Sequence, residues 1–134
     1  MVANSASVDE FGSLNVQVGG WEHTAPLTPP FTLCCHIAGI AALEESEWGT
    51  SQILDLTVSD LAGTKPSFAA SVLINGIREM PAPGVAMRTG FAVQFTFPVL
   101  ASTVACVRAF HQGTELATWT FEIRTAVDDA KPPA

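Results

Sequence analysis

Residues 91–97 (FAVQFTF) and 117–123 (ATWTFEI) decide the fold class of this chain, because both alternate apolar residues with small or polar ones. Successive side chains on a β-strand point to opposite faces of the sheet, so a period of two gives each strand one apolar and one polar face. Both stretches therefore predict antiparallel strands that are packed on one side only.

The same pattern extends outward along the chain. Further strands are expected at residues 13–18, 31–38, 52–59, 67–74, 89–97, 103–110 and 115–124. Gly and Asp residues typical of turns lie between them, as at Gly19-Gly20 and Asp60–Gly63. Seven short strands with regular turn signals predict an all-β protein, an antiparallel two-sheet β-sandwich of immunoglobulin-like or jelly-roll-like type. The stretch AALEESEW at 41–48 favours one short helix.

The length of 134 residues fits one domain. We expect an N-terminal arm at 1–12, the β-sandwich at 13–125 and a polar C-terminal tail at 126–134. The alternation also predicts which side chains form the core. They are Leu54, Leu56, Val58, Phe68, Val72, Phe91, Val93, Phe95, Val104, Trp119, Phe121 and Ile123.

The last hairpin can be assigned a register from its pattern. If residues 111–114 form the turn, Val104 faces Phe121 and Cys106 faces Trp119 on the inner side of the sheet. A slip by one residue would set apolar against polar side chains, so burial of one face favours the first register. In that register Arg108 shares the inner face and extends to its rim.

The net charge of −7 argues against binding to a nucleic acid backbone or to an anionic membrane, since both need clustered Lys and Arg. No apolar run approaches the roughly 18 residues that span a bilayer, and residues 1–12 do not resemble a signal peptide. Three cysteines, an odd number, favour a reducing compartment. We therefore expect a cytoplasmic protein or a component of an assembled particle, with no membrane insertion.

Cys34, Cys35 and His36 suggest a metal site, but on a strand Cys35 points away from its two neighbours. Two ligands on one face are fewer than zinc requires, so we expect no metal, no cofactor and no disulfide. His111 lies in a turn, and the chain contains no G-x-S-x-G nucleophile motif. We therefore expect no catalytic residues and no enzyme activity.

Three residues are candidates for surface recognition: Trp21, Trp48 and His111. The two tryptophans lie at strand ends beside glycine, where an exposed indole can stack on a sugar ring. The same positions are also suited to packing over the ends of the core.

The order Leu14–Gly20 (L-x-V-x-x-G-G), Asp60–Gly63 (D-x-x-G) and Phe121–Ile123 (F-x-I) resembles an uncharacterised family of small bacterial β-sandwich proteins. The resemblance covers residues 14–125 and implies a fold but no catalytic residues. In this chain Ser102-Thr103-Val104 replaces the Gly-x-Tyr with which the last hairpin of that family starts.

Only 14% of the residues are charged, against about 25% in typical soluble domains, and the strand faces are small and flat. This favours a non-enzymatic protein that acts by protein–protein association, as a structural or accessory component of an oligomer or larger assembly, including virion-type decoration. The partner is another copy of the chain or an assembly component. The alternatives are a small-molecule or carbohydrate-binding module, and a cytosolic bacterial protein of another function.

Overall fold

The computed structural model describes residues 1–9, 13–47, 49–60, 66–75 and 87–126. Trp48 and the C-terminal tail from residue 127 lie outside these ranges. Within them the chain forms strands and one short turn of 3-10 helix, in the following order: β1 (Val2–Val8), β2 (Leu14–Gly19), β3 (Phe31–Leu43), η1 (Glu45–Glu47), β4 (Ser51–Asp60), β5 (Pro66–Asn75), β6 (Met87–Val99), β7 (Thr103–His111) and β8 (Thr114–Ile123).

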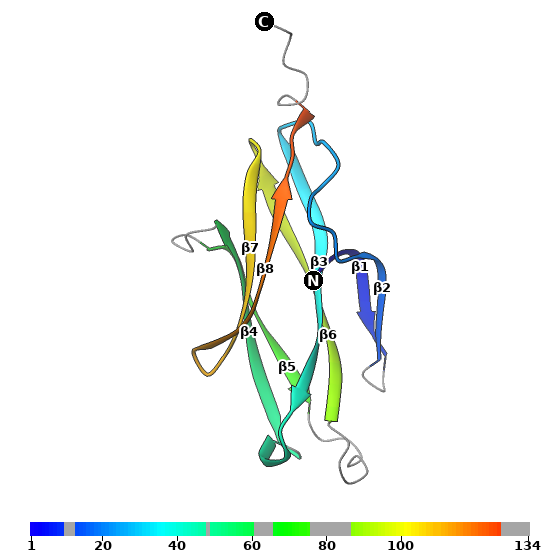
Figure 1. Cartoon of the computed structure of the whole chain (residues 1–134), viewed down its shortest axis with the longest axis vertical. Helices are drawn as coiled ribbons and strands as arrows, with labels where there is room; N and C mark the ends of the chain where they lie inside the picture. The colour runs from blue at the N-terminus through cyan, green and yellow to red at the C-terminus, as the bar shows by residue number, and fades with distance from the viewer. Residues whose placement is uncertain (10–12, 48, 61–65, 76–86, 127–134) are drawn as a thin grey trace, which may run out of the picture.

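The strands form two antiparallel four-stranded sheets that face each other (Figure 1). One sheet has the order β2-β1-β3-β6, and the other has the order β5-β4-β7-β8. The prediction of an all-β, two-sheet sandwich is therefore confirmed. Within the described ranges, no helix is long and apolar enough to cross a membrane.

Strands β3 and β6 form the longest pair, which runs without interruption from Phe31 opposite Val99 to Leu43 opposite Met87. β3 is longer than its predicted range of 31–38. The stretch that favoured a helix instead continues β3 through Leu43 and ends in η1, because pairing with β6 outweighs the modest helix propensity of alanine and glutamate.

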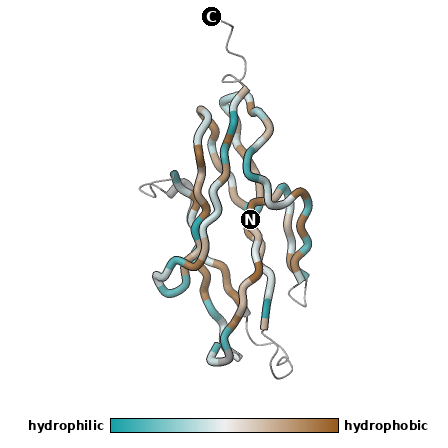
Figure 2. The backbone as a smooth tube through the Cα atoms, viewed as in Figure 1, coloured by the Kyte–Doolittle hydropathy of each residue, from teal (hydrophilic) through white to brown (hydrophobic). Residues whose placement is uncertain are grey.

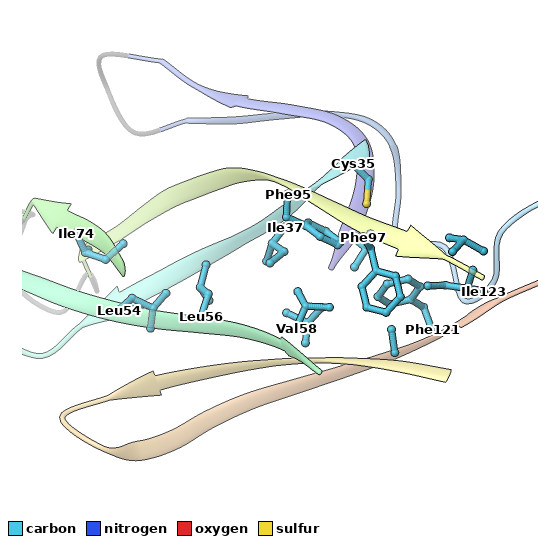
Figure 3. Close-up of a cluster of buried hydrophobic side chains, with 14 of the residues drawn as sticks. Cys35, Ile37, Leu54, Leu56, Val58, Ile74, Phe95, Phe97, Phe121 and Ile123 are labelled. Atoms are coloured by element: carbon cyan, nitrogen blue, oxygen red, sulfur yellow. The ribbon is translucent and has the colours of Figure 1, made fainter. Parts of the chain in front are cut away.

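The segment expected to be an N-terminal arm contains β1. This strand pairs with β3 only at Val2 and Ala3 and then diverges, and the β1–β2 hairpin contacts the outer face of β3 and β6 (Figure 3). Val2 and Ala3 are fully buried and Ala6 is nearly so. The small residues that suggested an arm allow the hairpin to pack closely against the sheet.

The predicted register of the last hairpin is wrong beyond its turn. Phe110 lies opposite Glu115 as expected, but a β-bulge follows, and Ala109 then pairs with Ala117. Leu116 is the extra residue, and it shifts the pairing by one position, which exchanges the two faces of β7. Val107, not Cys106, consequently lies opposite Trp119.

Two side-chain placements change with this register. Val104 is 41% exposed and lies opposite Glu122, so it is not a core residue. Arg108 lies on the outer face, where its guanidinium donates a hydrogen bond to the hydroxyl of Ser59 at 2.7 Å and lies 3.5 Å from the carboxylate of Glu115. Cys106 is buried as expected, but opposite Thr120.

The core lies between the two sheets, and Phe95, Phe121, Ile37, Leu56 and Ile123 are its largest fully buried side chains (Figure 3). Apolar residues recur along the strands, whereas the turn between β7 and β8 is hydrophilic (Figure 2). Five of the expected core residues are only partly buried and pack against this centre. They are Phe68, Val72, Phe91, Val93 and Trp119.

Candidate interaction surface

One side of the sandwich leaves strand edges unpaired. On the other side, β5 of one sheet contacts β6 of the second. Among the described residues, His23 bridges the edge of β8 away from β7 at Glu122, and Leu27 bridges Thr125 just beyond the end of the strand. Within the described ranges, no strand pairs with this edge along residues 114–120.

The facing part of β3 is also unpaired on one edge. The β1 pairing ends where the Met1 ammonium donates to the carbonyl of Ala38 at 2.8 Å and the Ala38 N–H donates to the carbonyl of Met1 at 3.0 Å. Beyond that point, residues 39–42 pair only with β6 among the described strands. We call residues 39–42 of β3 and 114–120 of β8 the open side of the sandwich; both strands are labelled in Figure 1.

An apolar groove of about 220 Å³ lies between these two edges. Leu56, Phe91 and Trp119 line it together with Ile40 and Leu116. Ile40 is 64% exposed and Leu116 is 61% exposed, which is high for large apolar side chains beside a groove. Leu116 is exposed because the bulge leaves it without an opposite residue on β7.

A second, polar cleft of about 480 Å³ adjoins the groove, and both are lined by Ala41, Leu54 and Leu116. We call it the His111 cleft. It forms where the η1 turn after β3 meets the β7–β8 turn. Its volume is within the usual range for ligand pockets.

A chain of hydrogen bonds fixes the side chains of the His111 cleft. The Thr50 hydroxyl donates to the carbonyl of Glu47 at 2.7 Å, so it must accept the 2.9 Å bond from the Gln52 amide. The Gln52 side-chain carbonyl then faces the Nε2 of His111 at 2.9 Å, so this nitrogen must carry its proton. The network joins the turn between β7 and β8 to the start of β4.

The His111 cleft is acidic. Glu44 and Glu47 line it, and none of its described lining residues is Lys or Arg. One oxygen of the Glu47 carboxylate accepts the backbone N–H of Glu44 at 2.9 Å, and the other lies 3.8 Å from Nε2 of His111. A carboxylate has about four acceptor sites, so Glu47 keeps capacity for another donor.

The structure describes two of the three predicted recognition residues, Trp21 and His111. His111 lines the polar cleft. Trp21 packs edge-on against Phe121, with ring centroids 5.2 Å apart, and its indole nitrogen is buried. The prediction for Trp48 falls outside the described residues. The described pair, Trp21 and His111, does not share a pocket among those that the structure shows.

The cysteine pair has the predicted geometry, since Cys34 is exposed and Cys35 is buried. The Gln94 amide donates to the sulfur of Cys34 at 2.9 Å. Burial, and secondarily the neighbouring Cys34, raises the pKa of Cys35 to about 12. The described part of the chain contains no group of three or more residues arranged to hold a metal ion.

Sequence reasoning missed the open side. Of its exposed apolar residues, Leu116 belongs to a predicted strand, at 115–124, and Ile40 lies between the strand predicted at 31–38 and the helix predicted at 41–48. Their exposure depends on where β1 leaves β3 and on a bulge, and neither has a local sequence signal.

Comparison with known protein families, with curated proteins and with solved structures finds no significant match for this chain. Its function therefore has to be inferred from the geometry of the chain itself.

Proposed function

We propose that this protein acts by protein–protein association, as a non-enzymatic structural or accessory component of an oligomer or larger assembly, and that the open side of the sandwich is its contact surface. The observation that carries the proposal is the unpaired edge of β8 at residues 114–120, beside an apolar groove.

An unpaired strand edge presents a row of N–H and C=O groups that can pair with another chain. Natural sheets protect such edges with Lys, Pro or inward-pointing charges. Residues 39–42 of β3 (GIAA) contain no charge and no proline, and residues 114–120 of β8 (TELATWT) contain no proline and a single charge, Glu115. Addition of a strand to an exposed edge is an established way of binding a partner.

The exposed apolar side chains add to this support. Ile40 and Leu116 flank the groove from the two sheets, so a partner strand that entered the groove would cover both. Burial of apolar surface stabilises a complex by roughly 25 cal/mol per Å² before the entropic cost of association is counted.

Light scattering tests the proposal. We expect particles heavier than the 14.1 kDa monomer as concentration rises or when a co-purifying partner is present. The double variant Ile40→Lys/Leu116→Lys should lose this association. Leu73→Lys is the matched control, because Leu73 is 64% exposed but lies on β5, away from the open side.

Two results would contradict the proposal. One is a monomer that binds no partner at any concentration up to about 1 mM, a concentration at which an interaction of about −4 kcal/mol is half-saturated. The other is loss of association in Leu73→Lys but not in the double variant. That result would indicate that the contact surface is the outer face of β4 and β5.

A small-molecule-binding function is the second candidate, and the His111 cleft favours it. Its fixed polar side chains and its volume of about 480 Å³ suit a compact polar ligand. Saturable quenching of tryptophan fluorescence by a ligand panel, abolished by His111→Ala, would favour this function over association.

A further inference from the structure

We infer that the open side binds an extended segment of a different protein, one that alternates apolar with polar residues and carries a Lys or Arg near its C-terminal end. The inference rests on the proposed function and names the chemistry of the partner.

The extended conformation follows from the edge of β8. Seven residues, 114–120, lack a strand partner on one side within the described ranges. At about 3.4 Å per residue this edge is about 24 Å long, enough to pair with a segment of about seven residues. Only an extended backbone matches the spacing of these donors and acceptors.

The alternation follows from the apolar groove. A strand added to β8 would turn every second side chain toward the space between the sheets, where Phe91, Leu56 and Trp119 lie. The intervening side chains would point to the outer face beside Thr118 and Thr120, which are exposed. Apolar residues fit the first set of positions, and polar residues fit the second.

The basic residue follows from the cleft that adjoins the groove. The groove passes at Leu116 into the His111 cleft, where Glu44 and Glu47 supply two carboxylates and no described Lys or Arg neutralises them. The net charge of −7 makes the surroundings negative as well. A Lys or Arg side chain that reached this cleft would find free acceptors on Glu47 and Glu44.

The direction of the partner strand places this basic residue. β8 starts at Thr114, beside His111 and the cleft, and runs away from it. Antiparallel pairs outnumber parallel pairs two- to three-fold, and the partner strand would then run toward Thr114. Its C-terminal end, with the basic residue, therefore lies at the cleft.

Charge also argues against a second copy of this chain as the occupant. β8 contains Glu115 and Glu122 but no Lys or Arg, so pairing of two β8 edges would bring no cation to the cleft. The described ranges contain three arginines: Arg108 donates to Ser59, Arg124 is paired with Glu122, and Arg88 lies on β6 opposite Ala42, not on β8.

The test is a selection from a displayed library of random 12-residue peptides on the full chain. Enriched peptides are then synthesised with blocked ends, and their affinity is measured by fluorescence anisotropy. We expect alternating sequences with a Lys or Arg in the C-terminal third. Glu44→Gln/Glu47→Gln should weaken binding about three- to tenfold, the effect of one or two partly exposed ion pairs. Asp55→Asn, on the outer face of β4, is the control for loss of a negative charge elsewhere on the surface and should leave affinity unchanged.

The remaining outcomes separate this inference from the proposed function. The inference would be overturned by enriched peptides that lack a basic residue, or by peptides whose affinity is unchanged by the glutamate substitutions. If Leu116→Lys still abolishes the binding of these peptides, association through the open side stands. If light scattering shows a homodimer that the peptide dissociates, the open side binds a second copy of the chain. This result would overturn the inference but not the proposed function. No enrichment, together with a monomeric particle, would overturn both.

Discussion

The register of the β7–β8 hairpin can be tested with the same substitution at two positions on one strand. Val107 is 5% exposed and faces Trp119 across the strands, whereas Val104 is 41% exposed and faces Glu122. The register expected from sequence reverses these roles, because it turns Val104 toward the core and Val107 outward. Val107→Ala and Val104→Ala therefore distinguish the two registers directly.

The expected magnitudes follow from burial. Val→Ala removes two methyl groups, worth about 1.6 kcal/mol at roughly 0.8 kcal/mol each, and an unfilled cavity adds to the cost. We therefore expect Val107→Ala to lower the free energy of unfolding by about 2–3 kcal/mol. Val104→Ala should cost only about 0.5–1 kcal/mol, mostly through the lower strand propensity of alanine, which affects both variants.

Urea denaturation followed by tryptophan fluorescence is a suitable assay. With a slope of about 2 kcal/mol per M, the Val107 variant should lose about 1–1.5 M in its midpoint, while the Val104 variant should lose about 0.25–0.5 M. Equal losses, or a larger loss at Val104, would refute the bulge at Leu116 and restore the register without it.

Four further predictions concern the core and the cysteines. Gly39→Ala should destabilise the protein by about 1 kcal/mol, because the added Cβ would lie 2.6 Å from the ring of Phe91. In a Phe91→Leu background this loss of stability should be smaller, which a double-mutant cycle measured by thermal unfolding can show. Iodoacetamide at about pH 8 should modify Cys34, which is exposed, and spare Cys35, as mass spectrometry can verify. Because the pKa of Cys35 is raised from 9.0 to about 12, its contribution to stability is present below pH 9 and should be lost as pH rises toward 12. Phe121→Ala, at the fully buried centre of the core, should cost about 3–5 kcal/mol in the same urea assay, and a smaller loss would contradict its burial.

The fold class was predictable because each sheet buries one face, and burial of one face imposes a period of two. Phe95 and Phe97 on β6 and Cys35 and Ile37 on β3 all point inward as their alternation indicates. In residues 31–38 and 91–97 the large apolar residues occupy one face and the small or polar residues the other, so these faces can be assigned without knowledge of the partner strand.

β7 was not predictable in the same way. Its sequence TVACVRAFH places apolar residues on both faces, with Val104 and Cys106 on one and Ala105 and Val107 on the other. The sequence of β7 alone does not select the inward face, and pairing with β8 through an unbroken ladder predicts the wrong one. The extra residue Leu116 breaks that ladder, and one inserted residue is sufficient to reverse the result.

The candidate site was only partly predictable for a related reason. His111 could be recognised as a turn residue, but its hydrogen bond to Gln52 joins positions 59 residues apart. The His111 cleft exists only because the end of β3 and the β7–β8 turn meet at one end of the sandwich. The local periodicity of the sequence does not predict that these two distant segments lie next to each other.

The open side follows from the path of a single strand. β1 pairs with β3 only at Val2 and Ala3, opposite Ile37 and His36, and then diverges, so residues 39–42 of β3 have no partner other than β6 among the described strands. On the facing sheet, residues 22–27 cover only the C-terminal end of β8. Among the described strands, residues 39–42 of β3 and 114–120 of β8 therefore lack a partner on one edge, and Glu115 is the single charged residue in these two stretches. An edge of this kind is an aggregation hazard for a free monomer unless a partner covers it, and this is the physical reason to look for that partner at Leu116 and the adjoining acidic cleft.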